Sequence, residues 1–316
     1  MKLFKQIAIL LLTALLFVSF NGSIYFLALC RCTSNFGAGT QPKMIEVEKY
    51  LPFDENSQIV KREASLKLTD DLPVLDGATA LLPVYSAIVN AVYPESSCSF
   101  NGESFSPESK MQYRNTVGAY RAIVDGGADI VFCAAPSKAQ LEYAEEKGVS
   151  LKLIPIGYEA FVFLVNEKNP VNDLTQEQIR GLFSGRYTNW AQVGGASRPV
   201  NALSRKEGSG SQTRMEKFMN GERIRKNPLS IVGGAIGFSF RYYVEGIVGN
   251  GGVKMLAVDG VAPTRENIQS KSYPLTNNFY AVVREDSFEG NVKLLVEWIL
   301  SEEGQQMISE SGYVGL

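Results

Sequence analysis

The 316-residue sequence contains no histidine. This absence excludes the Ser-His and Cys-His pairs that activate nucleophiles in many hydrolases, and it excludes zinc sites that use histidine. The 31 basic and 33 acidic residues nearly balance, with a formal net charge of −2, and no basic block appears. Such a balance argues against a nucleic-acid partner. We therefore expect a protein that is not an enzyme and has no metal, no cofactor and no nucleic-acid partner.

Long apolar runs are confined to the N-terminus. Lys2 and Lys5 precede an apolar run over residues 7–20, and a second run over residues 24–29 ends at Cys30. A basic start followed by an apolar stretch is typical of a secretory signal. Residues 27–30 resemble a lipoprotein cleavage site, which makes Cys30 a lipidation candidate, although the residue before it is bulky.

The alternative is an uncleaved anchor that spans the membrane with residues 7–30. In both cases the basic start places the body of the protein outside the cytoplasm. We expect residues 1–30 to be a signal peptide or membrane anchor. The protein is then exported and held at the outer face of the cytoplasmic membrane.

Cysteines are scarce, with only four in the chain. Besides Cys30 and its neighbour Cys32, Cys98 lies in a serine-rich segment and Cys133 ends an apolar run. Outside the cytoplasm a disulfide between Cys98 and Cys133 is one interpretation. A buried free thiol at Cys133 is the other.

From residue 72 onward short apolar strands alternate with amphipathic helical patterns, which predicts an α/β fold. Residues 31–71 are polar and are interpreted as a tether followed by an N-terminal extension. Two extended segments, 153–165 and 273–283, are suited to carry the chain between two lobes. We expect one lobe from residues 72–157 plus 276–316 and the other from residues 158–275. Two lobes joined by two crossings form a cleft that traps a ligand.

One polar motif in the predicted second lobe points to the ligand. Arg205 is followed by Gly208-Ser209-Gly210-Ser211 and then by a helical pattern. Glycine lets the backbone approach a ligand, and the first amides of a helix are unpaired donors at its positive end. Serine hydroxyls add donors, and an arginine fork fits a tetrahedral anion. The motif predicts an oxyanion site, with an ordinary loop and a solvated arginine as the alternative.

Two further segments share this physical logic. Ala78, Thr79 and Ala80 precede a helical pattern, and Thr116 stands where another helix is expected to begin. Their amides and hydroxyls would suit the same anion if the helix ends converge. The alternative is that Thr79 and Thr116 are plain N-caps, because threonine there stabilises a helix by about 1 kcal/mol.

With these motifs in place, the chain from residue 72 to 316 resembles the substrate-binding protein of the bacterial phosphate ABC transporter. This family belongs to the type II periplasmic binding proteins, which are two-lobed clamshells with two hinge crossings. The segments that carry the resemblance are, in chain order, Gly77-Ala78-Thr79 with Pro83-Val84-Tyr85, Thr188-Asn189-Trp190, Arg205 with Gly208-Ser209-Gly210-Ser211, Ala235-Ile236-Gly237-Phe238, Val258-Asp259-Gly260, Ala262-Pro263-Thr264, Tyr273-Pro274-Leu275 and Gly312-Tyr313-Val314.

The resemblance implies a monomer that holds inorganic phosphate, without water, between its lobes and delivers it to a membrane permease. The implied ligand-binding positions are Ala78, Thr79, Ala80, Thr116, Arg205, Ser209, Gly210 and Ser211.

One position departs from the family pattern. The family usually places an aspartate after the strand that begins at Asp129, and that aspartate accepts the proton of phosphate. This chain has Ala134 there, while Asp129 itself is interpreted as a strand-end residue. Asp76, Glu159 and Glu207 remain as other sources of an acceptor. A pocket with donors alone favours a fully ionised anion.

Three alternatives to phosphate delivery follow from these observations. A different oxyanion, such as sulfate or molybdate, fits the donor motif. An anchored anion sensor would use the same clamshell without transport. A hydrolase is the least favoured, because Ser209 and Ser211 have only Lys206 as a neighbouring base.

Overall fold

The structure is a computed structural model that describes residues 45–225, 234–249 and 251–316. The expected signal peptide or anchor over residues 1–30, with its candidate Cys30, lies outside these residues. Within the described ranges, no helix combines the length and the apolar character needed to cross a membrane.

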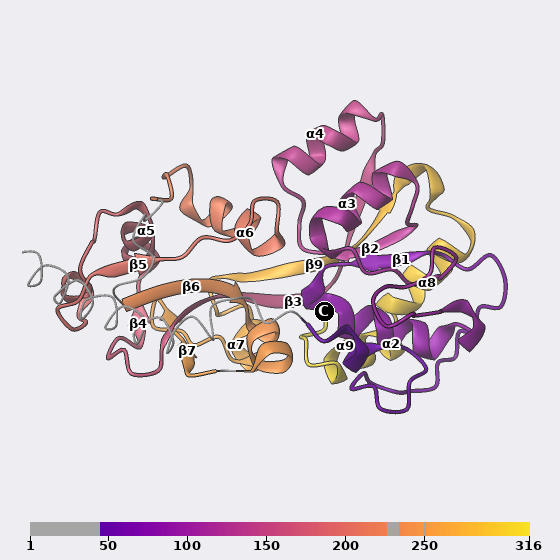
Figure 1. Ribbon diagram of the computed structural model, residues 1–316, viewed down its shortest axis with the longest axis horizontal. Coiled ribbons are helices and arrows are strands. Elements are labelled where there is room, and N and C mark those ends of the chain that lie inside the picture. Colours follow the sequence, from indigo (N-terminus) through magenta and orange to yellow (C-terminus); the bar gives the residue numbers. More distant parts are fainter. Residues whose placement is uncertain (1–44, 226–233, 250) are drawn as a thin grey trace, which may run out of the picture.

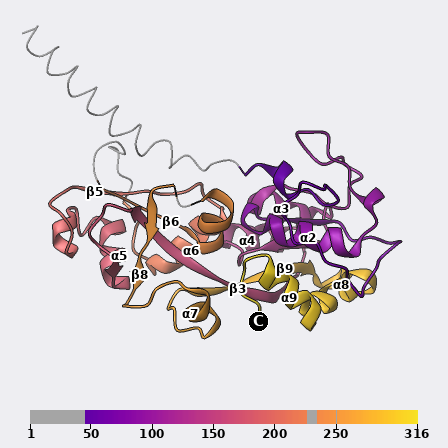
Figure 2. The ribbon, with the colours of Figure 1, turned by 90° about the horizontal axis from the view of Figure 1, so that it is seen from below.

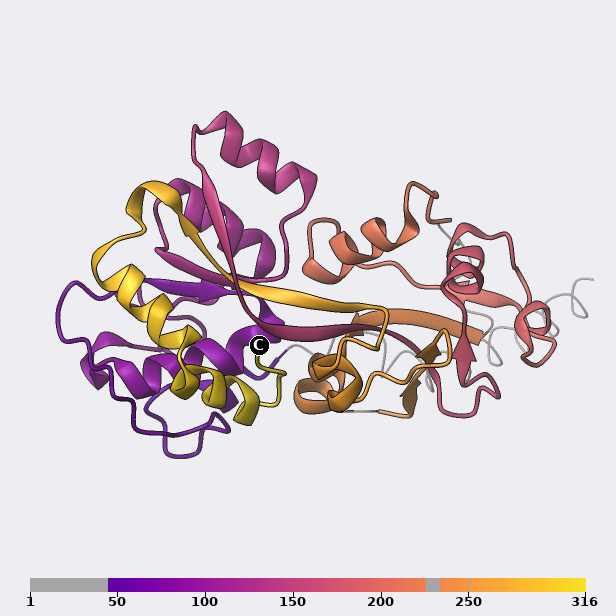
Figure 3. The same cartoon turned by 180° about the vertical axis from the view of Figure 1, so that it is seen from behind.

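Two lobes lie side by side along the long axis of the molecule (Figure 1). Two strands, β3 (Leu151–Asn166) and β9 (Thr276–Arg284), run through both lobes (Figure 3). Over the described residues the main sheet has the order β1-β2-β9-β3-β6-β5, with β7 also paired to β3, and β4 and β8 form a separate pair. This α/β architecture is the one the sequence predicts.

The first lobe contains both ends of the described chain. Its elements are η1 (Val47–Tyr50), β1 (Leu75–Gly77), η2 (Thr79–Leu81), α2 (Leu82–Val92), η3 (Glu95–Ser97), α3 (Asn115–Asp125), β2 (Ile130–Cys133), α4 (Lys138–Glu146), η6 (Glu285–Ser287), α8 (Gly290–Leu300) and α9 (Glu302–Glu310).

The second lobe is built from the middle of the chain. Its elements are β4 (Asp173–Leu174), α5 (Gln176–Ser184), η4 (Trp190–Val193), β5 (Val200–Ala202), α6 (Gly210–Met219), β6 (Gly234–Phe240), the π-helix η5 (Tyr243–Val248), β7 (Val253–Met255), β8 (Ala257–Val258) and α7 (Arg265–Gln269).

Strand alternation gives the first lobe two cores. Ile130 and Phe132 of β2 face α2, α8 and α9, whereas Val131 and Cys133 face α3 and α4. Helices α8 and α9 therefore lie beside α2, although most of the chain separates them (Figure 2). Successive residues of a strand point to opposite faces, so a continuous apolar run is buried on both sides.

The two cysteines of the first lobe are free thiols. Cys133 is fully buried, and burial raises its pKa well above the ordinary value. The disulfide interpretation is therefore wrong, and the buried-thiol interpretation is confirmed.

Two details of the N-terminal part differ from the expectation. The described part of the segment 31–71 packs Tyr50, Ile59 and Leu68 into the first core. The first strand begins at Leu75 rather than at residue 72, because the amide of Val74 bonds to the Asp129 carboxylate at 2.7 Å. Asp129 thus serves as the strand-end residue that the sequence indicates.

The second lobe has an aromatic core around β3. The rings of Phe161, Phe163, Phe183 and Phe238 contact one another with centroids 5.4–5.8 Å apart. Helix α5 begins with a capping box, in which Thr175 and Gln178 exchange side-chain and backbone hydrogen bonds. Ser137 and Gln140 form the same motif at the start of α4.

The strand β3 changes register at the point where it passes between the lobes. Its pairing with β9 shifts between Pro155 and Gly157. A Cβ atom at Gly157 would lie 2.6 Å from the Phe279 ring and 2.8 Å from the backbone oxygen of Val314. The crossing therefore requires glycine at this position because neighbouring atoms occupy the space.

We predict that Gly157→Ala lowers the free energy of unfolding by about 1–3 kcal/mol, the usual cost of overpacking. Urea unfolding followed by circular dichroism measures this change. Gly237→Ala in β6 is the matched control, because its nearest neighbour would be 3.9 Å away. Equal stability of the two variants would contradict the packing argument.

Candidate functional site

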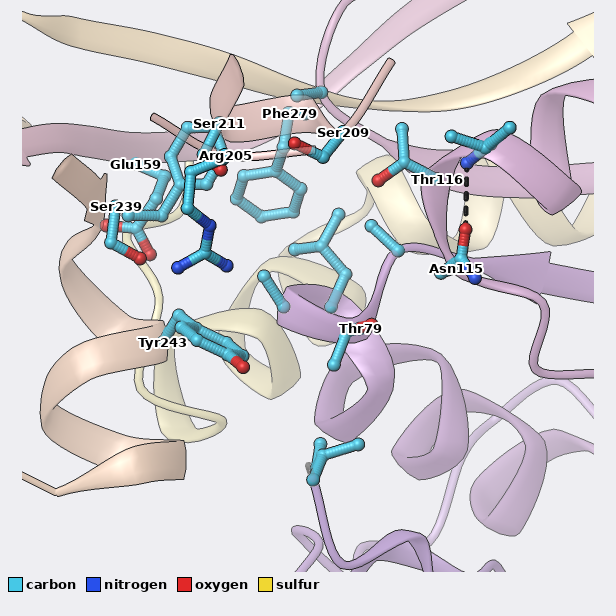
Figure 4. Close-up of a pocket in the computed structure, with 18 of the residues that line it drawn as sticks. Thr79, Asn115, Thr116, Glu159, Arg205, Ser209, Ser211, Ser239, Tyr243 and Phe279 are labelled. Atoms are coloured by element: carbon cyan, nitrogen blue, oxygen red, sulfur yellow. Dashed lines mark hydrogen bonds between the residues drawn. The ribbon is translucent and has the colours of Figure 1, made fainter. Parts of the chain in front are cut away.

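A cavity of about 460 Å³ lies between the lobes. Residues from both lobes and from the crossing strands line it, and Figure 4 shows how the labelled side chains surround it. The lining includes each of the eight residues expected to bind the ligand: Ala78, Thr79, Ala80, Thr116, Arg205, Ser209, Gly210 and Ser211. The structure thus brings together segments up to 133 positions apart in the sequence, from Ala78 to Ser211.

The second lobe contributes the start of α6. Gly208 has a φ of 74°, which turns the chain sharply before the helix. Ser209 is the N-cap: its hydroxyl accepts from the Gln212 amide at 3.3 Å and donates to the Lys206 carbonyl at 2.7 Å. Its side chain therefore stabilises the helix. The amides of Gly210 and Ser211 have no acceptor within the described part of the chain.

Arg205 stands at the base of this turn. Its amide donates to the side-chain oxygen of Gln212 at 2.9 Å, which fixes the backbone relative to α6. Its side chain is exposed and forms no ion pair with the described carboxylates. The guanidinium lies beside Tyr243 and opposes the pKa rise that burial causes in that phenol. A cation of this kind has charge available for an anion.

The first lobe offers the turn between β1 and α2. The amide of Ala78 already donates to the Phe132 carbonyl at 2.8 Å, so this amide does not serve a ligand. Thr79 is not an N-cap, because its hydroxyl pairs with the Tyr113 hydroxyl at 3.0 Å. The amides of Thr79 and Ala80 lack acceptors among the described residues.

Thr116 lies in the first turn of α3, one residue after the helix begins at Asn115. The Asn115 side chain accepts from the Val117 amide at 3.1 Å and so occupies the position of a cap. Thr116 is a buried residue, and its hydroxyl has no partner among the described residues. The plain N-cap interpretation is therefore wrong for Thr116 as well.

The start of α6 meets the start of α3. A Cβ atom placed on Gly210 would lie 3.5 Å from the Ala134 Cβ and 3.6 Å from the Thr116 hydroxyl. Nearby, the Gln140 side chain donates to the Gly208 carbonyl at 3.3 Å across the cleft. The lobes therefore touch along this side, and Ala134 faces the start of α6.

The lining residues that were missed at the sequence level include Ser239, Tyr243 and Phe279. Ser239 follows the quoted segment Ala235-Ile236-Gly237-Phe238, and strand alternation in β6 turns it toward the cavity. Tyr243 belongs to the π-helix η5, which has no signature in a single sequence. Only the predicted crossing strand points to Phe279, which lies where β9 passes the cleft.

None of the three acids named as replacements for the family aspartate is a free acceptor in the cavity. Asp76 is fully buried and accepts from the amides of Gly77 and Arg114 and from the Arg114 guanidinium, at 2.8–3.0 Å. Glu207 is exposed and does not line the cavity. Glu159 does line it, but other groups already hold its carboxylate.

Glu159 sits at the crossing point on β3. Its carboxylate accepts from the Ala160 amide at 2.8 Å and the Tyr242 amide at 3.3 Å, and it lies 3.6 Å from the Arg241 guanidinium. Arg241 also bonds to the Gly312 carbonyl at 2.8 Å. Burial raises the pKa of Glu159 to about 7, although Arg241 opposes the rise. This network ties the crossing strand to the C-terminal segment.

The fold and the cleft define a two-lobed solute-binding protein. Residues 76–303 match the family model described as the PBP superfamily domain, so the chain belongs to that superfamily. Within the superfamily, the chain is similar to PstS proteins.

Two sequence relatives illustrate this placement. The phosphate-binding protein PstS of Borreliella burgdorferi is 24% identical over 194 residues, which cover 54% of this chain and 68% of that protein. Protein SphX of Synechococcus elongatus is 24% identical over 273 residues, covering 78% of this chain and 77% of that one. Against PstS of Bacillus subtilis, the chain spans 61% of the relative's length.

Solved structures agree on the fold. A phosphate-bound structure from Clostridium perfringens, described as a phosphate ABC transporter substrate-binding protein, aligns with a TM-score of 0.58 and 24% identity over 79% of this chain and 99% of that chain. An ABC-type phosphate transport receptor from Vibrio cholerae aligns with a TM-score of 0.54 and 19% identity. The alignment covers 79% of this chain and 100% of that chain. These relatives are binding proteins rather than enzymes, as the sequence predicts for this chain.

The raised pKa of Glu159 predicts a pH effect on stability. Between its ordinary pKa of 4.5 and its folded value of about 7, the folded protein keeps a proton that the unfolded chain has lost. The contribution of this group to stability therefore falls as the pH rises through that window. Glu159→Gln removes this dependence, so its melting temperature relative to the wild type should rise from pH 5 to pH 8.

Scanning calorimetry at several pH values measures this difference. Glu245→Gln is the control, because Glu245 contacts the same Arg241 but is exposed. Its melting temperature relative to the wild type should change little with pH. If the melting temperature of Glu159→Gln relative to the wild type also stays constant with pH, Glu159 is ionised in the folded protein from pH 5 to pH 8.

Proposed function

We propose that this protein captures phosphate between its lobes and delivers it to the permease of an ABC importer. The observation that carries the proposal is the arrangement of unpaired donors from both lobes around one cavity. The amides of Thr79 and Ala80 enter from one side, and those of Gly210 and Ser211 from the other. Arg205 supplies the positive charge. The phosphate named for the relatives supports the choice of anion.

Lobe closure is the mechanism. A ligand shifts the equilibrium between open and closed forms only through contacts that are better in the closed form. Because Thr116 belongs to the first lobe and Ser211 to the second, an anion between them links the lobes. The attraction between the anion and the exposed Arg205 strengthens most on closure, because charges attract more strongly once they are removed from water.

Delivery fits the expected position of the protein. A body outside the cytoplasm, anchored through Cys30 or through residues 7–30, would meet the outer face of a permease. We propose that the closed form of the monomer is the one that the permease recognises. An anchored sensor uses the same closure, and transport assays with the permease separate the two roles.

We predict that Arg205→Ala weakens phosphate binding by about 2–4 kcal/mol, or roughly 30- to 700-fold, because a desolvated anion loses its charged partner. Calorimetric titration of the purified protein with inorganic phosphate measures the loss. Arg223→Ala is the control, because Arg223 is exposed and does not line the cavity. Wild-type affinity in Arg205→Ala would remove Arg205 from the site.

A second prediction concerns the effect of position 134 on the choice between phosphate and sulfate. An aspartate placed there would face the start of α6 and accept the proton of phosphate, while repelling an anion without a proton. We expect Ala134→Asp to raise the ratio of phosphate to sulfate affinity at least about tenfold, since a missing hydrogen-bond partner discriminates strongly.

Competition titrations with phosphate and sulfate at pH 7 give this ratio. Ala134→Leu is the matched control, because it has about the size of aspartate without its charge or its acceptor oxygens. It should leave the ratio within a few-fold of the wild type. If sulfate binds the wild type and phosphate does not, the protein is a binding protein for a different oxyanion.

A further inference from the structure

Three largely buried residues that line the cavity have hydroxyl groups without a partner among the described residues. The side chains of Thr116, Ser211 and Ser239 are only 8%, 7% and 4% exposed. None of these hydroxyls bonds to another described residue, and all three residues line the cavity. Their hydroxyls are therefore free to bond to a ligand in the cavity, as donors or as acceptors.

The deep part of the cavity offers these hydroxyls but no free carboxylate. Of the acids that line it, Glu159 is held by two amides and Arg241. The other, Glu103, is exposed on the loop before α3. Inorganic phosphate keeps at least one proton at neutral pH, and without a free carboxylate only neutral oxygens can accept it. A phosphate that carries an organic substituent has its second pKa near 6, so above pH 7 it has no proton to place.

The remaining walls are apolar. Leu81, Phe279 and Tyr313 approach from the first lobe and the crossing strand, while Tyr243 comes from η5 and Val47 from η1. Figure 4 shows the rings of Phe279 and Tyr243 reaching into the cavity beside the Arg205 guanidinium. Pockets for organic molecules combine such walls with a few polar groups that fix orientation.

The size of the cavity agrees with a larger ligand. A water molecule takes about 30 Å³ in the liquid, so a five-atom anion needs on the order of 100 Å³. In the cavity of about 460 Å³, such an anion leaves most of the volume for a further part of the ligand. The space beside Arg205 is bounded by rings and aliphatic side chains.

We propose that the preferred ligand is a small organic molecule with a terminal, fully ionised phosphate or phosphonate group. The charged group binds Arg205, the amides at the start of α6 and the hydroxyls of Thr116 and Ser211. The organic substituent lies against Tyr243 and Phe279. This inference rests on the proposed anion site and specifies what that anion is attached to.

Calorimetric titration of the full chain in detergent at pH 8 tests the inference, with phenyl phosphate, phenylphosphonate, inorganic phosphate and sulfate as ligands. We expect both phenyl compounds to bind at least about tenfold more tightly than inorganic phosphate. Inorganic phosphate binding as tightly as phenyl phosphate would overturn the inference and leave the proposed function intact. If no ligand binds, the proposed function fails as well.

Two variants test the assigned contacts. Tyr243→Ala should weaken phenyl phosphate binding at least about fivefold more than inorganic phosphate binding, since only the ester uses the ring. Tyr143→Ala on α4 is the matched control, because Tyr143 does not line the cavity. Ala134→Asp should reverse the preference toward inorganic phosphate. An equal loss for both ligands in Tyr243→Ala would contradict the placement of the substituent.

Discussion

The antiparallel pair of β3 and β9 is the constraint on which the rest of the structure depends. Its register runs from Leu151 opposite Arg284 to Ala160 opposite Thr276, through both lobes. Strand β3 has residues in the cores of both lobes, so the two sheets share one strand. The same pair places Glu159 and Phe279 at the cavity, so the connection between the lobes is also a wall of the site. Folding and ligand recognition thus share these residues.

The positive character of the cleft follows from the partners that its buried acids already have. Asp76 and Glu159 are both buried beside an arginine and bonded to backbone amides. Their charge is used in holding the chain, which leaves Arg205 as a cation without a carboxylate partner among the described residues. A site with this bias favours anions before any specific contact is made. Selectivity among anions then depends on where a ligand proton can be placed.

Much of the fold and much of the site can be predicted from the sequence. Alternating apolar strands and helices predict the α/β class, and the glycine-serine turn after Arg205 predicts the start of α6. Thr79 and Thr116 show where prediction stops. A threonine at such a position suits an N-cap and a ligand contact equally. Only the positions of Tyr113 and Asn115 in space distinguish these two roles. Tyr243 and Ser239 lie beyond reach for another reason, since a π-helix and an inward-facing strand residue depend on tertiary packing.

The replacement of an acid by Ala134 has a consequence beyond the loss of one acceptor. Ala134 lies opposite Gly210, where a Cβ atom would be only 3.5 Å away, so the lobes approach closely through small residues. A close approach brings the α6 amides within reach of an anion held by Thr116. The same small residues leave a space that a negatively charged carboxylate would otherwise occupy. Donors that converge without a nearby negative charge bind most strongly the anion with the highest charge and no proton, and the apolar walls determine what that anion carries.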